Sequence, residues 1–500
     1  MRLPRLLAAV LTLACASATG PAARQTPQPD VFALLRTVDG MDARRAWPGF
    51  RPADWPIAVF DGNRTLLLRH PSPPPEFAPL DGHPGVLAMA GRHSAVSGNS
   101  TTTLGGARTA TIVARPGDNR ENILLAYVEE LFHVFWLQRH TAFRPNEMAR
   151  YTYPVKDARN LQRVFAENEA LARALDAPDA DGAARWAAAM LQVRRERERA
   201  LTPDARAFET GLEMMEGTAN AVARVLVGLP ASATSGRLRA ACEADQLRWR
   251  YYDSGAAICL LLDRLQPGWQ LRIDADAGLT TLAALEAAVA ATGAKPLAFT
   301  AAESSQFEQR AAAAIADLSA RQAKVRSELL GRRGPRILIE VGDGRERFRV
   351  TRFDPINLLV LDAGEVAHPR YLTLSGAAGT IEIVNPAFAP GAFAGVVALT
   401  QAAGGHPLGD GIRAVTLVGF ASAPTLDRRD GRVVVEGDGV RLSLAGAEAR
   451  VEGETIRVSL ALGTDDRVAR IEAGLLPPVT RSGAAQVTPS LQPQAAGPRR

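Results

Sequence analysis

The chain has 500 residues, of which 47% are hydrophobic and 22% charged, and its formal net charge is +5 at pH 7. This length favours two or three domains and is sufficient to bury a sizeable core. The 58 basic residues are scattered and usually have acidic neighbours, as in the stretch from Arg194 to Arg199. Because no basic face with interleaved aromatic residues emerges, the composition argues against a nucleic-acid-binding protein.

The first 18 residues have the pattern of a signal peptide. Arg2 and Arg5 precede an apolar run from Leu6 to Leu13, and Ala16-Ser17-Ala18 provides the small residues of a cleavage site. We therefore expect an exported protein, located in the periplasm or outside the cell.

Other features bear on the state of the exported chain. A lipoprotein signal would acylate Cys15, but Thr12 stands where such a signal normally has Leu, so soluble export is preferred. No later apolar run reaches the roughly twenty residues that a membrane span needs, and no transmembrane segment is expected. Cys242 and Cys259 remain in the mature chain and can form a disulfide or stay two buried thiols.

The pattern after residue 55 is that of a β-hairpin. Ile57 to Phe60 and Thr65 to Leu68 are short β-like runs on either side of a turn at Asp61-Gly62-Asn63. A further run, Thr109 to Val113, predicts another strand. Together these segments predict a small N-terminal sheet.

A long helical region is expected after this sheet. Asp118 or Asn119 can cap a helix from about Arg120 to His140, and the block from Tyr153 to Arg332 continues with mostly helical patterns. Breaks are expected near Pro154, Asp176-Ala177-Pro178, Leu229-Pro230 and Pro267-Gly268. The middle of the chain is therefore predicted to be an α-helical bundle.

Short β-rich runs replace the helical pattern after Gly334-Pro335. They include Ile337–Val341, Tyr371–Leu374, Val433–Val435 and Val451–Leu462. The last residues are rich in Pro, Ala, Gln and Ser and lack apolar periodicity, which predicts a disordered tail. The sequence thus predicts an α+β protein, with a signal peptide at 1–18, an α+β domain at 19–330, a β-rich domain at 335–475 and a tail at 476–500.

Apolar residues occupy nearly every position from Ile123 to Leu137, which is typical of a helix that is covered on all sides. The exceptions are Tyr127, Glu129, Glu130 and His133. Two adjacent carboxylates in such surroundings lose hydration worth several kcal/mol unless they are paired, protonated or bound to a metal ion. A solvent-exposed polar face therefore does not explain them.

The spacing of these residues permits a metal site. Glu129 and His133 are four residues apart and project from the same side of a helix, while Glu130 lies about 100° round from Glu129. One metal ion can therefore contact Glu129 and His133. The alternative is a core salt bridge in which Arg residues from neighbouring helices hold both carboxylates.

A third ligand is expected on the helix near Phe208 to Leu226. This segment carries Glu209, Glu213, Glu216 and Asn220 at spacings of four, three and four residues, which predicts a single polar stripe. Glu216 is the strongest candidate ligand among them.

Glu129-Glu130-Leu131-Phe132-His133, followed later by Glu216-Gly217-Thr218-Ala219, resembles the HExxH and Glu-Gly-x-Ala motifs of gluzincin-type metallopeptidases. In HExxH the two His bind zinc, and the Glu takes a proton from the water that attacks a peptide carbonyl. The resemblance covers about Pro56 to Leu265 and implies a zincin-like fold there. More loosely, the whole chain is similar to exported bacterial proteins in which a helical peptidase-like region precedes a β domain.

Carried over by position, the resemblance implies that His133 and Glu216 are zinc ligands and that Glu130 is the general base. Glu129 departs from the pattern, because it stands where the first His is expected. Tyr252, in the segment after Arg250, could stabilise an oxyanion as in related folds, or it could be an ordinary core tyrosine.

A carboxylate at position 129 would change the chemistry of the site. Two negative charges on the ion make its bound water less acidic, and carboxylate-rich ligand sets suit Mn or Fe better than they suit Zn. We therefore expect an exported zinc-metallopeptidase-like protein, weakly active or catalytically decayed, with a protein or peptide as substrate. The alternative is a non-enzymatic binding or scaffold protein whose β domain contacts a partner.

Other enzyme classes fit the sequence less well. Glu130 and His133 match the Glu-x-x-His of carboxylate-bridged di-iron bundles, with Glu213 and Glu216 on a second helix. That arrangement needs a second Glu-x-x-His, and Glu365-Val366-Ala367-His368 lies in the β-rich part before a proline. The sequence also lacks the Gly-x-Ser-x-Gly elbow of serine hydrolases and a phosphate-cradling Gly-rich loop.

Overall fold

The computed structural model describes residues 29–460 apart from residues 116, 241–242, 342–347, 356, 363, 386, 388–392, 405 and 410. The fold is α+β, as predicted, and the chain divides into two compact units, Met1–Ala320 and Arg321–Arg500. The predicted signal peptide, Cys242 and the predicted tail lie outside the described residues. Among the described helices, none combines the length and the apolar character that crossing a membrane requires.

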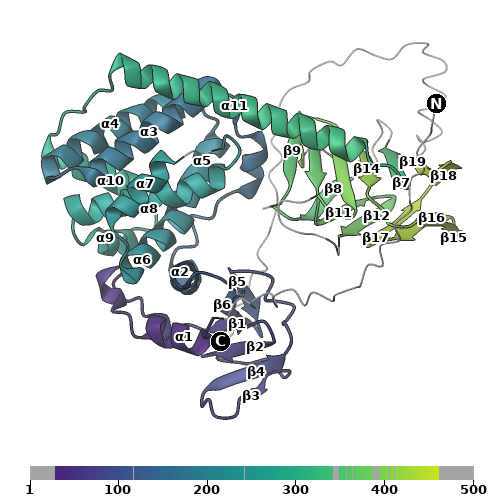
Figure 1. Cartoon of the computed structure of the whole chain (residues 1–500), viewed down its shortest axis with the longest axis horizontal. Coiled ribbons are helices and arrows are strands. Elements are labelled where there is room, and N and C mark those ends of the chain that lie inside the picture. Colours follow the sequence, from purple (N-terminus) through teal and green to yellow (C-terminus); the bar gives the residue numbers. More distant parts are fainter. Residues whose placement is uncertain are drawn as a thin grey trace, which may run out of the picture. The chain divides into compact units, whose positions relative to one another are not determined.

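A six-stranded sheet forms the N-terminal part of the first unit (Figure 1). The predicted hairpin is confirmed by the antiparallel pairing of β1 (Ile57–Phe60) with β2 (Arg64–Leu68). The Asp61 carboxylate accepts a hydrogen bond from the backbone N–H of Asn63 and so stabilises the turn. β1 also pairs in parallel with β6 (Ala107–Val113). The strand order is β3-β4-β2-β1-β6-β5, where the remaining strands are β3 (Ala78–Pro79), β4 (Val86–Ala90) and the edge strand β5 (Ser100–Leu104).

Helix α2 (Arg120–Arg139) follows the sheet where the sequence predicts it. Asn119 caps its first turn, because the Asn119 side chain accepts a hydrogen bond from the backbone N–H of Glu121. Val128 and Leu131 have no exposed surface, in agreement with the expectation of a helix that is covered on all sides. The helix packs against strands β5 and β6 of the sheet.

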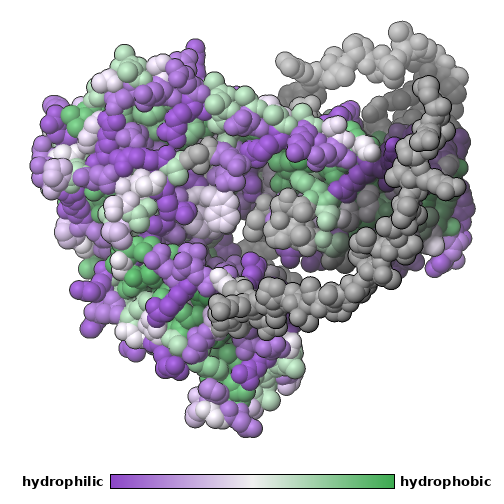
Figure 2. All heavy atoms as spheres, in the orientation of Figure 1, coloured by the Kyte–Doolittle hydropathy of each residue, from purple (hydrophilic) through white to green (hydrophobic). Residues whose placement is uncertain are grey.

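The rest of the first unit is mostly helical, and three of its helices, which end at Asp176, Val227 and Leu265, end close to predicted Pro and Gly breaks. The helices are α1 (Val31–Asp39), α3 (Ala158–Asp176), α4 (Ala180–Glu198), α5 (Pro203–Leu212), α6 (Thr218–Val227), α7 (Ala231–Arg239), α8 (Leu247–Leu265), α9 (Trp269–Ala275) and α10 (Thr281–Thr292). Helix α11 (Ala301–Leu330) begins in this unit and ends in the second. Short 3₁₀ turns occur at η1 (Ala43–Arg45), η2 (Pro52–Asp54) and η3 (Glu147–Thr152), and η4 (Glu213–Gly217) is a π-helix. Hydrophilic side chains cover much of the helical face seen in Figure 2.

The second unit contains two sheets that enclose one apolar core. Residues of both sheets meet in it, for example Ile339 and Val415 from one sheet and Leu374 and Leu442 from the other. The first sheet has the order β18 (Ala447–Glu452), β19 (Thr455–Leu460), β7 (Arg336–Val341), β14 (Ile412–Val418), β13 (Val397–Ala402), β10 (Glu365–His368) and β9 (Leu359–Asp362). The second has the order β15 (Thr425–Arg429), β16 (Arg432–Gly437), β17 (Val440–Ala445), β12 (Gly379–Val384), β11 (Tyr371–Gly376) and β8 (Arg349–Phe353).

The β-rich runs predicted in this unit are strands, with one difference. The run Val451–Leu462 was expected to be a single β segment, whereas the structure has a hairpin of β18 and β19 with its turn at Gly453. Gly453 has a positive φ of 60°, which allows the chain to reverse there. The two strands therefore occupy neighbouring positions in one sheet.

Candidate metal centre

Three side chains of the first unit converge in an arrangement that could hold a metal ion. Glu129, His133 and Glu216 each offer one ligand atom, and these atoms all lie within 4.8 Å of one another. His133 Nε2 lies 3.1 Å from Glu216 Oε2. Glu129 keeps part of its surface exposed, whereas His133 and Glu216 are buried. One imidazole and two carboxylates form a ligand set that divalent ions accept.

The π-helix η4 determines which way Glu216 points. In η4 the backbone N–H of Thr218 bonds to the carbonyl of Glu213, five residues earlier, so the residues after it are rotated relative to those of α5. The predicted single polar stripe is therefore wrong. Glu209 and Glu213 bond to buried arginines, while Glu216 faces His133.

A contact between two glycines brings η4 close to α8. A Cβ added at Gly217 would lie 2.5 Å from Gly255 Cα, and a Cβ added at Gly255 would lie 2.7 Å from Gly217 Cα. Only glycine permits this approach. As a result Tyr252, one turn before Gly255 on α8, forms a hydrogen bond with the Glu216 carboxylate.

An arginine also contacts Glu216. Arg248 Nη2 donates to Glu216 Oε1 over 2.5 Å, and Arg248 Nη1 bonds to Glu147 in η3. The other oxygen of Glu216, Oε2, is the one that faces His133. Arg248 therefore holds the carboxylate in one orientation and leaves Oε2 directed at the centre.

Glu130 lies beside the edge strand of the sheet. Thr101 Oγ1 of β5 is 3.3 Å from the Glu130 carbonyl oxygen and 3.4 Å from Glu130 Oε2. Glu130 is buried, with 8% of its surface exposed. The residue proposed from the sequence as general base is thus next to Glu129 but is not one of the three convergent side chains.

Glu129 is linked to α8 through polar side chains of α6. Asn220 Nδ2 lies 3.5 Å from Glu129 Oε2, and Arg224 Nε donates to Asn220 Oδ1 over 2.6 Å. Arg224 Nη2 in turn donates to Asp253 Oδ1 over 3.2 Å. Asn220 is therefore the residue of the predicted stripe that contacts Glu129.

Burial changes the protonation of the carboxylates in the centre. Loss of hydration raises the pKa of Glu129 to about 7 and the pKa of Glu130 to about 8. Burial alone would lower the pKa of His133, but the carboxylates of Glu216, Glu130 and Glu129 together outweigh it, and the pKa of His133 rises to about 9. Burial opposes ionisation of Glu216 too, yet the facing His133 holds the pKa of Glu216 below its ordinary value.

The imidazole of His133 has one nitrogen without a partner. His133 Nδ1 is buried, and no hydrogen-bond partner for it exists among the described residues. In most metal sites the non-ligating nitrogen of a histidine donates to a carboxylate, a carbonyl or water, which fixes the ring. The three ligand atoms therefore fit a divalent ion by type and spacing, and no described residue accepts from or donates to the other ring nitrogen.

No protein-family model, curated protein or solved structure matches this chain. Within the chain itself, the structure brings the residues proposed from the sequence into one region. Glu129, Glu130 and His133 come from α2, Glu216 from η4 and Tyr252 from α8. The sequence reasoning missed Arg248, whose position four residues before Tyr252 places it on the same face of α8.

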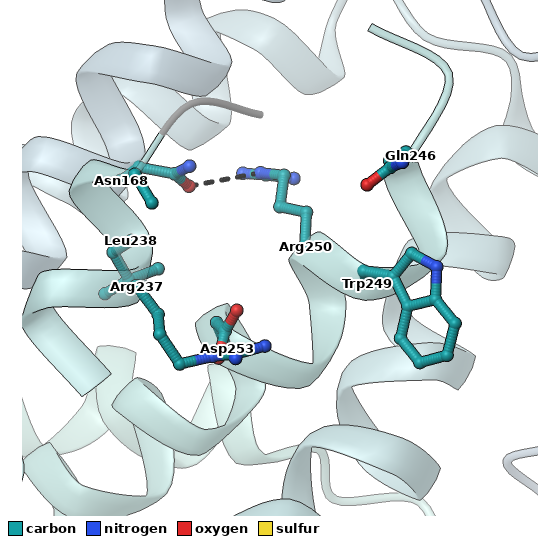
Figure 3. Close-up of a pocket in the computed structure, with 8 residues that line it drawn as sticks. Asn168, Arg237, Leu238, Gln246, Trp249, Arg250 and Asp253 are labelled. Atoms are coloured by element: carbon teal, nitrogen blue, oxygen red, sulfur yellow. Dashed lines mark hydrogen bonds and ion pairs between the residues drawn. The ribbon is translucent and has the colours of Figure 1, made fainter. Parts of the chain in front are cut away.

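The structure also contains a pocket that the sequence did not indicate (Figure 3). It lies among α3, α7 and α8 and has a volume of about 190 Å³. Trp249, on the helix that carries Arg248 and Tyr252, is half exposed at the pocket. The lining residues are Asn168, Arg237, Leu238, Ala240, Gln246, Trp249, Arg250 and Asp253.

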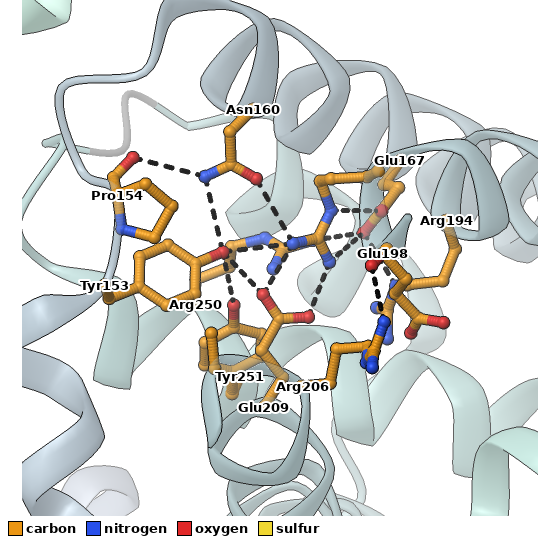
Figure 4. Close-up of polar contacts among 12 residues, drawn as sticks. Tyr153, Pro154, Asn160, Glu167, Arg194, Glu198, Arg206, Glu209, Arg250 and Tyr251 are labelled. Atoms are coloured by element: carbon orange, nitrogen blue, oxygen red, sulfur yellow. Dashed lines mark hydrogen bonds and ion pairs between the residues drawn. The ribbon is translucent and has the colours of Figure 1, made fainter. Parts of the chain in front are cut away.

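A charged network fills the interior between α3, α4, α5 and α8 (Figure 4). Glu167 bonds to three arginines, Arg194, Arg197 and Arg250. These arginines hold the pKa of Glu167 down at about 2 although burial opposes its ionisation. Glu209 and Glu213 complete the network through Arg197 and Arg194 respectively.

This network corrects one interpretation of the sequence. Arg194 and Arg197 were expected to be matched by acidic residues nearby in the sequence, but both are buried and their partners come from other helices. Three carboxylates balance three guanidinium groups, which permits their burial. The salt bridges expected as the alternative for Glu129 and Glu130 therefore occur at Glu167, Glu209 and Glu213 instead.

The di-iron arrangement does not occur in the part of the chain that the structure describes. Glu365 and His368 belong to strand β10, as their predicted β context implied, and residues three apart on a strand point to opposite faces. Glu365 bonds to Arg326, and His368 Nε2 bonds to Thr400. Glu213 is also unsuitable as an iron ligand, because Arg194 holds both of its oxygens.

Proposed function

We propose that Glu129, His133 and Glu216 bind a divalent metal ion and that the protein is an exported metallopeptidase-like hydrolase of low activity. The proposal rests on one observation. The ligand atoms of these three side chains, two from α2 and one from η4, lie within 4.8 Å of one another. Zinc is the first choice of metal because of the resemblance to gluzincins, and Mn or Fe would suit the two carboxylates.

The chemistry of the site divides among its residues. A divalent ion supplies a Lewis acid that activates water and polarises a carbonyl group. Glu130, next to Glu129 on α2, is the general base. Its pKa of about 8 lies close to neutral pH, so the ionised form that accepts a proton and the protonated form that later donates it are both populated.

Strand β5 supports a peptide as the substrate. It is the edge strand of its sheet, so an extended peptide can add to it through backbone hydrogen bonds. Thr101 of β5 contacts Glu130, and a peptide bound along this edge would therefore pass beside the proposed base. Tyr252, whose hydroxyl is bonded to Glu216, positions that carboxylate in this proposal and does not act on an oxyanion.

Low activity follows from two departures from a well-supported zinc site. Glu129 places a second carboxylate where an imidazole is expected, which weakens the acidifying effect of the ion on water. His133 Nδ1 also lacks a partner among the described residues. Loss of such outer partners typically costs about 10–100-fold in metal affinity or activity.

The experiment that tests the proposal compares casein cleavage by the native protein, Glu129→His and Glu130→Gln, each supplied with Zn, Mn or Fe. We expect slow metal-dependent cleavage by the native protein, none by Glu130→Gln, and faster zinc-dependent cleavage by Glu129→His. Metal binding by Glu129→His alone would identify a decayed peptidase. If neither protein binds a metal ion, the proposal is refuted.

A specific observation favours a second candidate, a non-enzymatic scaffold. Glu216 is already held by His133, Arg248 and Tyr252, so the cluster is compatible with a closed polar core. In that case the β-rich second unit would contact the partner. The two candidates differ in metal content, because the scaffold retains its fold and stability when all divalent ions are removed.

A further inference from the structure

The pocket beside α8 presents an incompletely used guanidinium group. Arg250 Nε donates to Asn168 Oδ1 over 3.2 Å, and Arg250 Nη2 donates to Glu167 Oε2 over 2.5 Å. Arg250 Nη1 has no hydrogen-bond partner among the described residues, although only 4% of the Arg250 surface is exposed. Figure 3 shows this side chain extending from α8 across the pocket towards Asn168. A buried donor without an acceptor is costly, and a ligand oxygen would remove that cost.

The remaining charged residues of the pocket are arranged around a partly exposed arginine. Arg237 donates through Nε to Asp253 over 2.7 Å, and its side chain keeps 56% of its surface exposed. Asp253 also accepts from Arg224, so its charge is compensated by two guanidinium groups. The charge of Arg250 is already balanced by Glu167 in the buried network, whereas Arg224 and Arg237 share the single carboxylate of Asp253, which leaves one positive charge at the pocket for a ligand.

The rest of the lining is suited to the body of a small organic ligand. Trp249 is half exposed, and its ring packs 5.3 Å from the ring of Tyr252. Leu238 and Ala240 add apolar surface. A volume of about 190 Å³ is far larger than the roughly 15 Å³ that one water molecule needs, so the pocket has room for an amino-acid-sized group.

We propose that this pocket binds the carboxylate of a small monoanionic ligand, with Arg250 and Arg237 as the cationic contacts and Trp249 covering its apolar part. A single carboxylate matches the single surplus positive charge, whereas a phosphate dianion would meet the carboxylate of Asp253 with too few cations. A free carboxylate of this kind occurs at the end of a peptide and in simple organic acids. The pocket is formed without residues of the metal centre, so the proposal does not depend on the proposed hydrolase function.

Calorimetric titration of the metal-free full-length mature protein tests this proposal. The probes are N-acetyl-leucine, which carries the carboxylate of a peptide end, isovalerate, which is a simple acid, and N-acetyl-leucinamide, which has the same shape as the first without the charge. We expect N-acetyl-leucine to bind and N-acetyl-leucinamide to bind at least about tenfold more weakly, the difference expected when a charge-assisted hydrogen bond is lost. Equal affinity for isovalerate would assign the pocket to simple acids, and weaker binding of isovalerate would assign it to peptide ends.

Variants locate the binding in this pocket. Arg237→Gln and Trp249→Leu are the test variants, because both side chains are about half exposed, whereas Arg250 also holds the buried Glu167. Each should weaken N-acetyl-leucine binding about tenfold while the circular dichroism spectrum stays native. Arg195→Gln, at an exposed ion pair on α4, is the matched control and should bind normally. The proposal is overturned if N-acetyl-leucine does not bind, if the amide binds equally well, or if Arg237→Gln binds like the native protein.

Discussion

At the scale of single residues, the chemistry of the centre depends on how Glu129 and Glu130 differ. Glu129 is partly exposed and is among the three convergent side chains, whereas Glu130 is buried and contacts Thr101. Their adjacency places them about 100° apart on α2, so they face different surroundings. This difference supports the proposed roles, metal binding by Glu129 and proton transfer by Glu130.

The two roles predict opposite effects of two otherwise matched substitutions. Glu129→Gln removes a charged ligand and should lower the affinity for a divalent ion at least about tenfold, equivalent to about 1.4 kcal/mol. Glu130→Gln should leave metal affinity within a factor of about three, because Glu130 is not among the three ligands. Equilibrium titration of each purified variant with zinc gives the measurement. A larger loss of affinity in Glu130→Gln than in Glu129→Gln would reverse the assignment.

At the scale of elements, the π-helix η4 and the glycine contact with α8 determine the geometry of the centre. Glu216 faces His133 because η4 rotates it away from Glu213, and Tyr252 reaches Glu216 because Gly217 and Gly255 allow the two helices to approach. A side chain at either glycine would separate the helices.

Gly217→Ala should therefore both destabilise the protein and disturb the centre. Its Cβ would lie 2.5 Å from Gly255 Cα, and overpacking of this kind typically costs about 1–3 kcal/mol. Gly236→Ala in α7 is the control, because nothing lies within 4 Å of the added Cβ and an alanine favours the helix by about 0.5–1 kcal/mol. Urea denaturation followed by tryptophan fluorescence compares the two. If Gly217→Ala proves as stable as Gly236→Ala, the close contact does not exist in solution.

The elements also show what could be predicted from the sequence. Helix α2 and its cap at Asn119 follow from local patterns, and so does the pairing of Glu129 with His133 across one turn. The polar stripe from Glu209 to Asn220 could not be predicted correctly, since it assumes regular α geometry and the π-turn at η4 interrupts it. The extra residue in that turn has no recognised signal in the local sequence.

At the scale of the whole molecule, the first unit is organised around buried charge as well as apolar packing. The three arginines of the network come from α4 and α8, and their carboxylate partners come from α3, α5 and η4. The sequence could not show this network or the neighbouring pocket, because the partners lie 12 to 83 residues apart in the chain. Through Arg250 the network holds α8 in place. The same helix places Arg248 and Tyr252 at the metal centre and Trp249 at the pocket.

Removing the central carboxylate of this network should be strongly destabilising. Glu167 contacts all three arginines, so Glu167→Gln leaves buried positive charge uncompensated, which typically costs about 3–5 kcal/mol. Glu286→Gln, at the exposed pair with Arg195, should change the free energy of unfolding by less than about 1 kcal/mol. Tryptophan fluorescence in urea reports this unit, because all six tryptophans lie in it. A small effect of Glu167→Gln would show that the network tolerates the missing charge.

The second unit should lose stability in acid because of His368. Burial lowers the pKa of His368 to about 3, so between pH 6.5 and 3 the unfolded chain binds a proton that the folded chain does not. The free energy of unfolding of the second unit is therefore highest above about pH 6.5. It decreases as the pH falls towards 3, and His368 contributes at most about 1.4 kcal/mol per pH unit to this decrease. Urea unfolding at several pH values, followed by circular dichroism, should show the free energy of unfolding decreasing with pH in the native protein. The decrease should be smaller in His368→Gln. Identical slopes would exclude His368 as its origin.

The most direct test of the central claim is the metal content of the protein. The protein is stripped of metal, equilibrated with zinc, manganese or iron, and freed of unbound ions. The bound metal per chain is then measured by mass spectrometry, with His133→Ala treated in the same way. We predict one divalent ion per native chain and none in His133→Ala, because His133 contributes the imidazole among the three ligands. Absence of bound metal in the native protein, or equal binding by His133→Ala, would contradict the assignment of Glu129, His133 and Glu216 as a metal centre.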